Sequence, residues 1–187
     1  MTVAISMLRG VNVGGRRKIG MEALRKLYAS LGLRNAQTYI QSGNVVFATE
    51  ERDLDLVGGR IGTAIKRAFG FRPEIVLRTV SQLREVVAGN PFATRTGLDP
   101  RKLVVMFPAG DPGAENLRKV LEIPADPEEL HVAGRHLYIW FPNGVGRAEL
   151  SLALVEKTLK IPATGRNWNT VVKLLAMAEA MEASSQS

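Results

Sequence analysis

The chain has 187 residues, of which 45% are hydrophobic and 23% charged, with a formal net charge of +7 and no cysteine. This composition is typical of a globular protein of one domain or two small ones, and it excludes disulfides, thiolate catalysis and cysteine-ligated zinc. No apolar run approaches the roughly 18 residues of a membrane span, and Arg9 interrupts the apolar start, so we expect a cytoplasmic protein without a secretory signal or membrane contact.

Apolar periodicity predicts six elements in the first half of the chain, in the order β-α-β-β-α-β. They cover residues 3–8, 21–31, 37–41, 44–49, 54–69 and 74–78. Ser42-Gly43 separates the two middle strands, which is typical of a hairpin with a two-residue turn. This order of elements is the split βαβ pattern of ferredoxin-like domains.

A short helix over 81–88, capped by Ser81, and a polar connection over 89–101 follow. The first order of elements then recurs over residues 103–107, 112–121, 130–133, 136–141, 149–159 and 160–164. Gly134-Arg135 again fits a two-residue hairpin turn. A final amphipathic helix covers 167–183, and a frayed tail covers 184–187.

These patterns predict an α+β fold of two consecutive ferredoxin-like (βαββαβ) halves plus a C-terminal helix. The predicted division is a first half over 1–78, a helix and linker over 79–101, and a second half over 102–187. A duplication explains the repeated order of elements. A single α+β domain with all the strands in one sheet is the alternative.

The excess of positive over negative charge lies in the first half. Residues 1–78 carry 13 basic and 6 acidic side chains, a balance of +7, whereas residues 79–101 carry 3 and 2, and residues 102–187 carry 9 and 10. An anionic partner should therefore meet the first half of the chain. A general enrichment in arginine, without any function, explains the same charge.

The connection between the first strand and the first helix has the composition of an anion-binding loop. Its glycines let backbone amides turn toward a ligand, and the N-terminus of a following helix favours anions. The glycine spacing is that of neither a P-loop nor a dinucleotide fingerprint, and a turn with solvated cations is the alternative. The residues predicted to bind a ligand here are Arg9, Gly10, Asn12, Gly14, Gly15 and Lys18.

Two further segments bear on this site. Arg166 and Asn167 open the last helix and are predicted to close over the anion as ligand-binding residues, although Asn167 is also a good N-cap without any function. The turn at Ser42-Gly43-Asn44 is expected at the opposite end of the sheet from the first loop, and therefore need not meet it.

Alternation along the hairpin strands puts aliphatic residues on one face and polar and aromatic residues on the other. The second faces carry Tyr39, Gln41, Asn44 and Val46 in the first hairpin, and Glu129, His131, His136, Tyr138 and Trp140 in the second. Such a face can stack nucleobases, or it can pack on the rest of the protein. Two histidines with Glu129 form a conceivable metal set, but we predict no metal and no cofactor.

Several motifs together resemble the bacterial DUF1697 family. The first loop, Leu8-Arg9-Gly10-Val11-Asn12-Val13-Gly14-Gly15 with Lys18 and Met21, is followed by Thr38-Tyr39-Ile40-Gln41-Ser42-Gly43-Asn44-Val45-Val46-Phe47. Asn90-Pro91-Phe92 and Arg166-Asn167-Trp168-Asn169-Thr170 match later motifs. The resemblance runs nearly end to end. It implies an α+β fold related to ferredoxin-like plaits, and no activity, because the family name denotes a domain of unknown function.

Three functions are compatible with these observations. The first is binding of a small phosphorylated or carboxylated ligand at the 9–18 loop, by a binding protein or a modest enzyme. The second is a nucleic-acid-binding module that uses the basic first half. The third is a regulatory or interaction domain. No motif names a reaction, a substrate or an oligomeric state.

Overall fold

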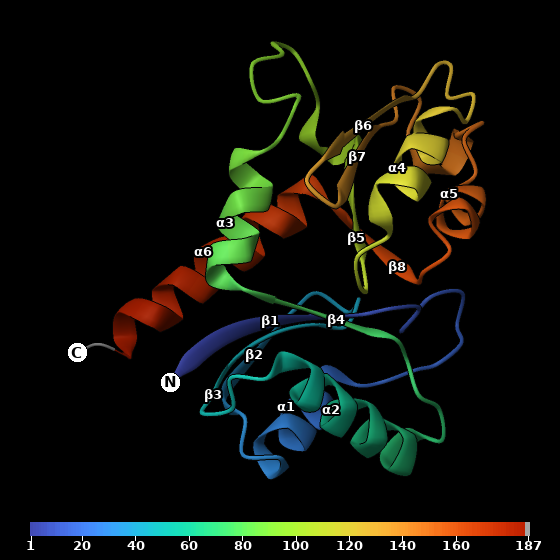
Figure 1. Cartoon of the computed structure of the whole chain (residues 1–187). Helices are drawn as coiled ribbons and strands as arrows, with labels where there is room; N and C mark the ends of the chain where they lie inside the picture. The colour runs from blue at the N-terminus through green and yellow to red at the C-terminus, as the bar shows by residue number, and fades with distance from the viewer. Residues whose placement is uncertain (186–187) are drawn as a thin grey trace. The chain divides into compact units, whose positions relative to one another are not determined.

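The computed structural model describes residues 1–185 and contains two four-stranded antiparallel sheets with helices, a mixed α+β fold (Figure 1). Contacts divide the chain into two units. Unit 1 comprises Met1–Arg84 and the chain from Lys173 onward, and unit 2 comprises Glu85–Val172. Within residues 1–185, no helix is both long and apolar enough to cross a membrane.

Unit 1 is built on a sheet with the strand order β2-β3-β1-β4. Its elements are β1 (Thr2–Leu8), α1 (Met21–Ser30), β2 (Arg34–Tyr39), β3 (Asn44–Thr49), α2 (Leu54–Phe69), β4 (Ile75–Thr79) and the start of α3 (Val80–Ala88). All neighbouring strands are antiparallel. Because β3 lies between β1 and β2 and is antiparallel to both, β1 and β2 run in the same direction.

The core of unit 1 lies between one face of this sheet and the two helices α1 and α2, which Figure 1 shows on the same side of it. The buried side chains of the helices recur at three- and four-residue spacing, as predicted. The Asp53 carboxylate caps α2 by accepting from the amides of Asp55 and Leu56, and Gly70 ends the helix with a φ of 81°. The buried residues that meet here are Ala4, Leu8, Leu24, Leu27, Tyr28, Val45, Phe47, Val57, Ile61 and Ile65.

Unit 2 repeats the same order of elements and strands, with a sheet ordered β6-β7-β5-β8. Its elements are β5 (Leu103–Pro108), α4 (Gly113–Leu121), β6 (Glu129–Ala133), β7 (His136–Trp140), α5 (Leu152–Leu159), β8 (Ala163–Asn167) and the start of α6 (Trp168–Ser184). Because the strands form two sheets, the single-sheet alternative is wrong. The predicted tail begins inside α6, and its residues 186–187 lie outside the described part of the chain.

The two hairpin turns differ from each other. Ala133 pairs with His136, which confirms the two-residue turn at Gly134-Arg135. In the first hairpin Tyr39, rather than Gln41, pairs with Asn44, so the predicted two-residue turn is wrong and the turn has four residues, 40–43. The register differs by two residues, and because strand side chains alternate with a period of two, each strand residue keeps its predicted face.

The starts of two helices differ from prediction because side-chain caps decide them. Helix α3 is capped by Thr79 rather than Ser81: the Thr79 hydroxyl accepts from the Gln82 amide at 3.2 Å, and the Gln82 side chain accepts from the Thr79 amide at 3.0 Å. This is a reciprocal capping box. Helix α5 begins after Ser151, whose hydroxyl accepts from the Leu154 amide. The strand predicted over 160–164 is β8, which starts three residues later.

The polar and aromatic face of the second hairpin packs inside unit 2. Tyr138 and His136 are buried. The Tyr138 hydroxyl donates to the Val86 carbonyl at 2.6 Å. The rings of His131 and His136 meet Phe92 and Phe107 edge to face. The interpretation of this face as an open stacking surface for nucleobases is therefore wrong, because the Tyr138 ring at its centre is buried.

Candidate functional site

Residues 12–17, within the connection between β1 and α1, form a short hairpin, which together with Lys18 we call the finger. The Arg16 amide donates to the Val13 carbonyl at 3.1 Å, and these two residues form an antiparallel bridge. Gly14 and Gly15 sit at the tip with φ values of 58° and 74°. Positive φ at both central positions is the mark of a type I′ turn, which favours glycine. The glycine pair thus has a structural role as a turn.

Asn12 closes the base of the finger. Its side-chain Oδ1 accepts from the Ile19 amide at 2.9 Å, and its Nδ2 donates to the carbonyls of Ile19 at 3.0 Å and Gln41 at 2.7 Å. The Asn12 amide itself donates to the Arg17 carbonyl at 3.2 Å. The carboxamide therefore ties the two ends of the loop together, and it ties the loop to the β2–β3 turn.

Apolar residues on both sides of the finger anchor it to the core. Val11 and Ile19 are buried and belong to the core cluster of unit 1. The Arg17 guanidinium lies 5.8 Å from the centre of the Phe71 ring, a cation–π distance. The backbone of Gly10 passes beneath this guanidinium, since a Cβ there would lie 3.5 Å from Nη1 of Arg17. The finger thus projects from a fixed base.

The β2–β3 turn lies against this loop, which corrects the expectation that the two sit at opposite ends of the sheet. The Leu8 amide donates to the Gly43 carbonyl at 3.0 Å, beside the bond from Asn12 to Gln41. The reason is topological: β1 and β2 run in the same direction, so the segments that follow their C-terminal ends meet at one end of the sheet. The two motifs that were separate in the sequence therefore lie side by side at one end of the sheet.

The finger is basic and open. Arg16, Arg17 and Lys18 are exposed, and none of them forms an ion pair with another described residue. Helix α1 follows directly, and its N-cap Gly20 provides no side-chain hydrogen bond. The partial positive charge of the helix N-terminus therefore adds to the charge of the finger. Arg9 is half-buried at the end of β1, where its amide donates to the Glu74 carbonyl.

Arg166 and Asn167 belong to unit 2, whereas the finger belongs to unit 1. Arg166 is 7% exposed and donates to the Thr164 hydroxyl at 2.7 Å and the Gly165 carbonyl at 2.8 Å. Burial lowers the pKa of its guanidinium to about 10. Asn167 caps α6 through the Asn169 amide and donates to the Arg101 carbonyl. Both side chains thus have structural partners within unit 2.

Sequence reasoning missed the counterpart of Arg166 in unit 1. Arg78 lies on β4 opposite Ile5, as Arg166 lies on β8 opposite Val105. It is 2% exposed and donates to the carbonyl of the preceding residue, as Arg166 does. Aligning the strands of the two halves in the sequence would have identified Arg78 as the counterpart of Arg166.

The conceivable metal set does not assemble. Glu129 pairs with Arg95 at 2.6 Å, and the two histidine rings pack on phenylalanines. Within residues 1–185, no group of three or more histidine or acidic side chains is arranged to hold a metal ion.

Two four-stranded α+β units, with a basic finger at one end of the first sheet, define the class of protein. A family model described as "Protein of unknown function (DUF1697)" matches residues 1–138. The chain belongs to this family, which confirms the resemblance for the motifs within residues 1–138. The motif over 166–170 lies outside the matched residues.

A similar fold occurs in a solved structure, conserved bacterial protein SP0830 from Streptococcus pneumoniae. The two chains share 23% sequence identity with a TM-score of 0.71, over 95% of this chain and 98% of that one. At this identity the likeness concerns the fold alone. A comparison with curated proteins finds no match.

Proposed function

We propose that the protein binds a small phosphorylated or carboxylated ligand at the finger. The observation that carries this proposal is the cluster of Arg16, Arg17 and Lys18, which have no carboxylate partner among the described residues and stand on a loop that Asn12 holds in place. Because the loop is already ordered, it loses little conformational entropy when an anion binds. Lys18 and the backbone at Gly14 and Gly15 contact the anion, while Gly10 and Asn12 shape the loop.

The predicted roles of Arg9, Arg166 and Asn167 in binding are secondary in this proposal. Arg9 leaves β1 beside the loop and adds positive charge there. Arg166 and Asn167 already serve β8 and α6 through hydrogen bonds. We therefore assign direct contact with the anion to the finger first. We also propose that both units are ferredoxin-like domains, on the support of their element order and strand order.

A thermal-shift screen over nucleotides, sugar phosphates and acyl phosphates tests the small-ligand proposal. A binding ligand raises Tm by mass action, and the double variant Arg16→Ala/Lys18→Ala should abolish that rise. The matched control is Arg34→Ala/Arg52→Ala, which removes the same charge from unit 1 at the opposite end of the sheet, where β2 begins and β3 ends. A screen with no stabilising compound, or equal loss in both double variants, would refute the proposal.

Binding of nucleic acid is a second candidate, because the finger is exposed rather than enclosed in a pocket. A polyanion suits such a surface, and counterion release makes its affinity fall steeply with salt. Fluorescence anisotropy with labelled single strands and duplexes at about 50 mM salt tests it. Each finger cation that contacts a phosphate should lower the salt slope by about 1 when removed. Absence of binding at that salt concentration eliminates this candidate.

A further inference from the structure

A second basic region lies on the outer stripe of α2 and shares no residue with the finger. A hollow of about 690 Å³ opens there. Leu56, Gly59, Thr63 and Arg67 line it from successive turns of α2, at the three- and four-residue spacing of one helix face. Leu31, at the end of α1, and Arg72, in the α2–β4 connection, complete its walls. All these residues belong to unit 1.

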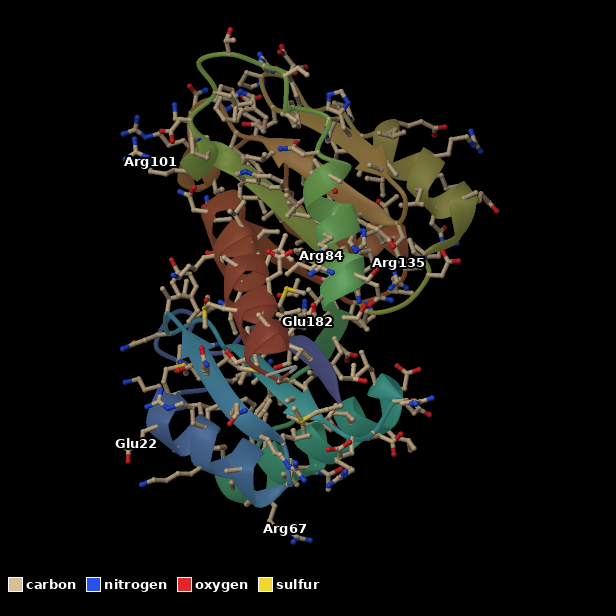
Figure 2. The ribbon with its side chains drawn as sticks, turned by 90° about the vertical axis from the view of Figure 1, so that its left-hand side faces the viewer. Glu22, Arg67, Arg84, Arg101, Arg135 and Glu182 are labelled. Atoms are coloured by element: carbon tan, nitrogen blue, oxygen red, sulfur yellow. The ribbon has the colours of Figure 1, made fainter. Side chains whose placement is uncertain are left out.

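Three arginines give this hollow its positive charge. Arg60, Arg67 and Arg72 line it, and none of them forms an ion pair with another described residue. Arg60 donates through Nη2 to the Leu31 carbonyl at 2.7 Å, which fixes its position between α1 and α2. Figure 2 shows Arg67 extending outward from α2. An anion entering the hollow therefore meets guanidinium groups without displacing a carboxylate.

Two acidic residues also line the hollow, at its other end. Asp53 is engaged as the cap of α2 through the amides of Asp55 and Leu56. With a rise of 1.5 Å per residue, Asp55 lies about 18 Å along the helix axis from Arg67. The hollow is therefore basic toward the C-terminal half of α2, and the anionic group of a ligand belongs at that end.

Gly59 leaves the backbone of α2 bare within the hollow. A Cβ at Gly59 would have no heavy atom within 4 Å, so the helix backbone is open there. At Gly62 the Arg72 side chain already lies across the helix, with Nε 2.9 Å from the place of a Cβ. Leu56 beside Gly59 is 57% exposed. The bare backbone thus accepts a planar group, and the exposed leucine gives it an apolar contact.

We propose that this hollow binds a planar aromatic compound that carries a phosphate or carboxylate, such as an aryl phosphate or a nucleoside monophosphate. The ring lies on Gly59 next to Leu56, and the anionic group meets Arg67 and Arg72 at the basic end of the hollow. Guanidinium forks bind phosphate and carboxylate oxygens through charge-assisted hydrogen bonds and also stack on planar groups. The apolar contact with Leu56 distinguishes this ligand from inorganic phosphate.

Titration of the full ¹⁵N-labelled chain with 4-nitrophenyl phosphate, and separately with AMP, tests this proposal. We expect the amide signals of residues 59–64 to shift with saturation, and inorganic phosphate at equal ionic strength to leave them unsaturated. Gly59→Leu covers the bare backbone, and leucine is a better helix former than glycine, so the fold is retained. This variant and Arg67→Ala/Arg72→Ala should each weaken binding by about tenfold or more.

The double variant Arg16→Ala/Lys18→Ala is the matched control, since it removes two cations from the finger and leaves the hollow intact. Unchanged binding in this control, together with loss in Gly59→Leu, supports the hollow. The proposal is overturned if the signals of 59–64 do not move with either aromatic probe, if Gly59→Leu binds as well as the original chain, or if inorganic phosphate saturates the same signals. Shifts confined to residues 12–18 also overturn it and support the finger alone.

Discussion

Two separate constraints require glycine at position 43, a left-handed backbone conformation and a lack of space for a side chain. The φ of 72° at Gly43 is the left-handed conformation that a turn glycine provides. In addition, a Cβ at this position would lie 2.8 Å from Cβ of Leu8 and 3.4 Å from Cβ of Val11. The β2–β3 turn approaches the end of β1 so closely that no side chain fits between them.

We expect Gly43→Ala to lower the free energy of unfolding by roughly 2–4 kcal/mol, because the left-handed conformation and the forced overlap each carry a cost. Gly14→Ala is the matched control: its φ is 58°, but nothing lies within 4 Å of its Cβ. It should cost about 1 kcal/mol, for the backbone conformation alone. Urea denaturation measures both variants, and equal costs would show that the close approach does not matter.

Two buried tyrosines should make the protein less stable at high pH. Burial raises the pKa of Tyr28, whose hydroxyl lies 2.7 Å from the Ser6 hydroxyl, and raises the pKa of Tyr138 from 10.0 to about 12. A pKa that is higher in the folded state means that the folded state holds the proton more tightly. The stability that each protonated tyrosine contributes is fully present below its pKa in the unfolded chain, near 10. This stability is lost as the pH rises above that pKa.

The free energy of unfolding should therefore fall above about pH 10, by up to about 1.4 kcal/mol per pH unit for each tyrosine. Tyr28→Phe should remove one of the two contributions to this slope. It should also cost about 1 kcal/mol at neutral pH, for the lost hydrogen bond to Ser6. Urea denaturation at a series of pH values provides the test, and a slope unchanged by Tyr28→Phe would contradict it.

The finger depends on one carboxamide for its shape. Asn12→Ala removes three side-chain hydrogen bonds, and we expect a cost of roughly 1–3 kcal/mol together with faster hydrogen exchange at the Ile19 amide. Because the cations remain, any fall in ligand affinity reports the lost preorganisation. Gln41→Ala, which keeps the accepting carbonyl, is the control and should leave exchange at Ile19 unchanged.

Variants at the start of α3 test whether Thr79 or Ser81 caps this helix. Thr79→Ala should cost about 1 kcal/mol, because it removes the hydroxyl that accepts from the Gln82 amide. Ser81→Ala, two residues later on an exposed site, should change stability by less than about 0.5 kcal/mol. Thermal denaturation of both variants checks this, and the reverse order of effects would restore Ser81 as the cap.

At the scale of the whole molecule, the two units repeat each other in more than element order. Both sheets place the first strand of the unit between the third and the fourth. Both last strands carry a buried arginine opposite the middle of the first strand. A duplication followed by sequence divergence would leave this correspondence. It also explains why the halves show no clear residue-by-residue identity.

Unit 1 is completed by the C-terminal part of α6. Arg84 on α3 bridges Glu179 at 2.7 Å and Glu182 at 3.1 Å, and Figure 2 shows the Arg84 and Glu182 side chains near each other. Leu174 and Met181 are buried on the same helix. We expect a chain truncated after Val172 to lose several kcal/mol of stability, at about 1.5–3 kcal/mol for each large buried apolar side chain.

Calorimetry of this truncated chain tests whether the C-terminal part of α6 belongs to unit 1. Its unfolding should shift to lower temperature, with early loss of hydrogen-exchange protection in β1 and β3. Arg84→Ala in the full chain should have a much smaller effect, since exposed ion pairs contribute little. An unchanged transition after truncation would show that unit 1 does not need α6.

Local patterning was enough to predict the order of strands and helices, the helix over residues 54–69, the hairpin turn at Gly134-Arg135 and the cap at Asn167. These features depend on residues within a few positions of one another, through apolar periodicity, turn conformation and capping. The family motifs were also visible in the sequence. The cap of α3 was missed because Thr79 ends a strand and caps a helix at once.

The contact between the first loop and the β2–β3 turn was decided only by the tertiary structure. It joins residues about thirty positions apart, and it requires β1 and β2 to run in the same direction with β3 between them. The burial of Arg78 and Arg166 likewise depends on how whole sheets are covered. Local sequence determined what each segment becomes, and packing between distant segments decided which side chains remain exposed to a ligand.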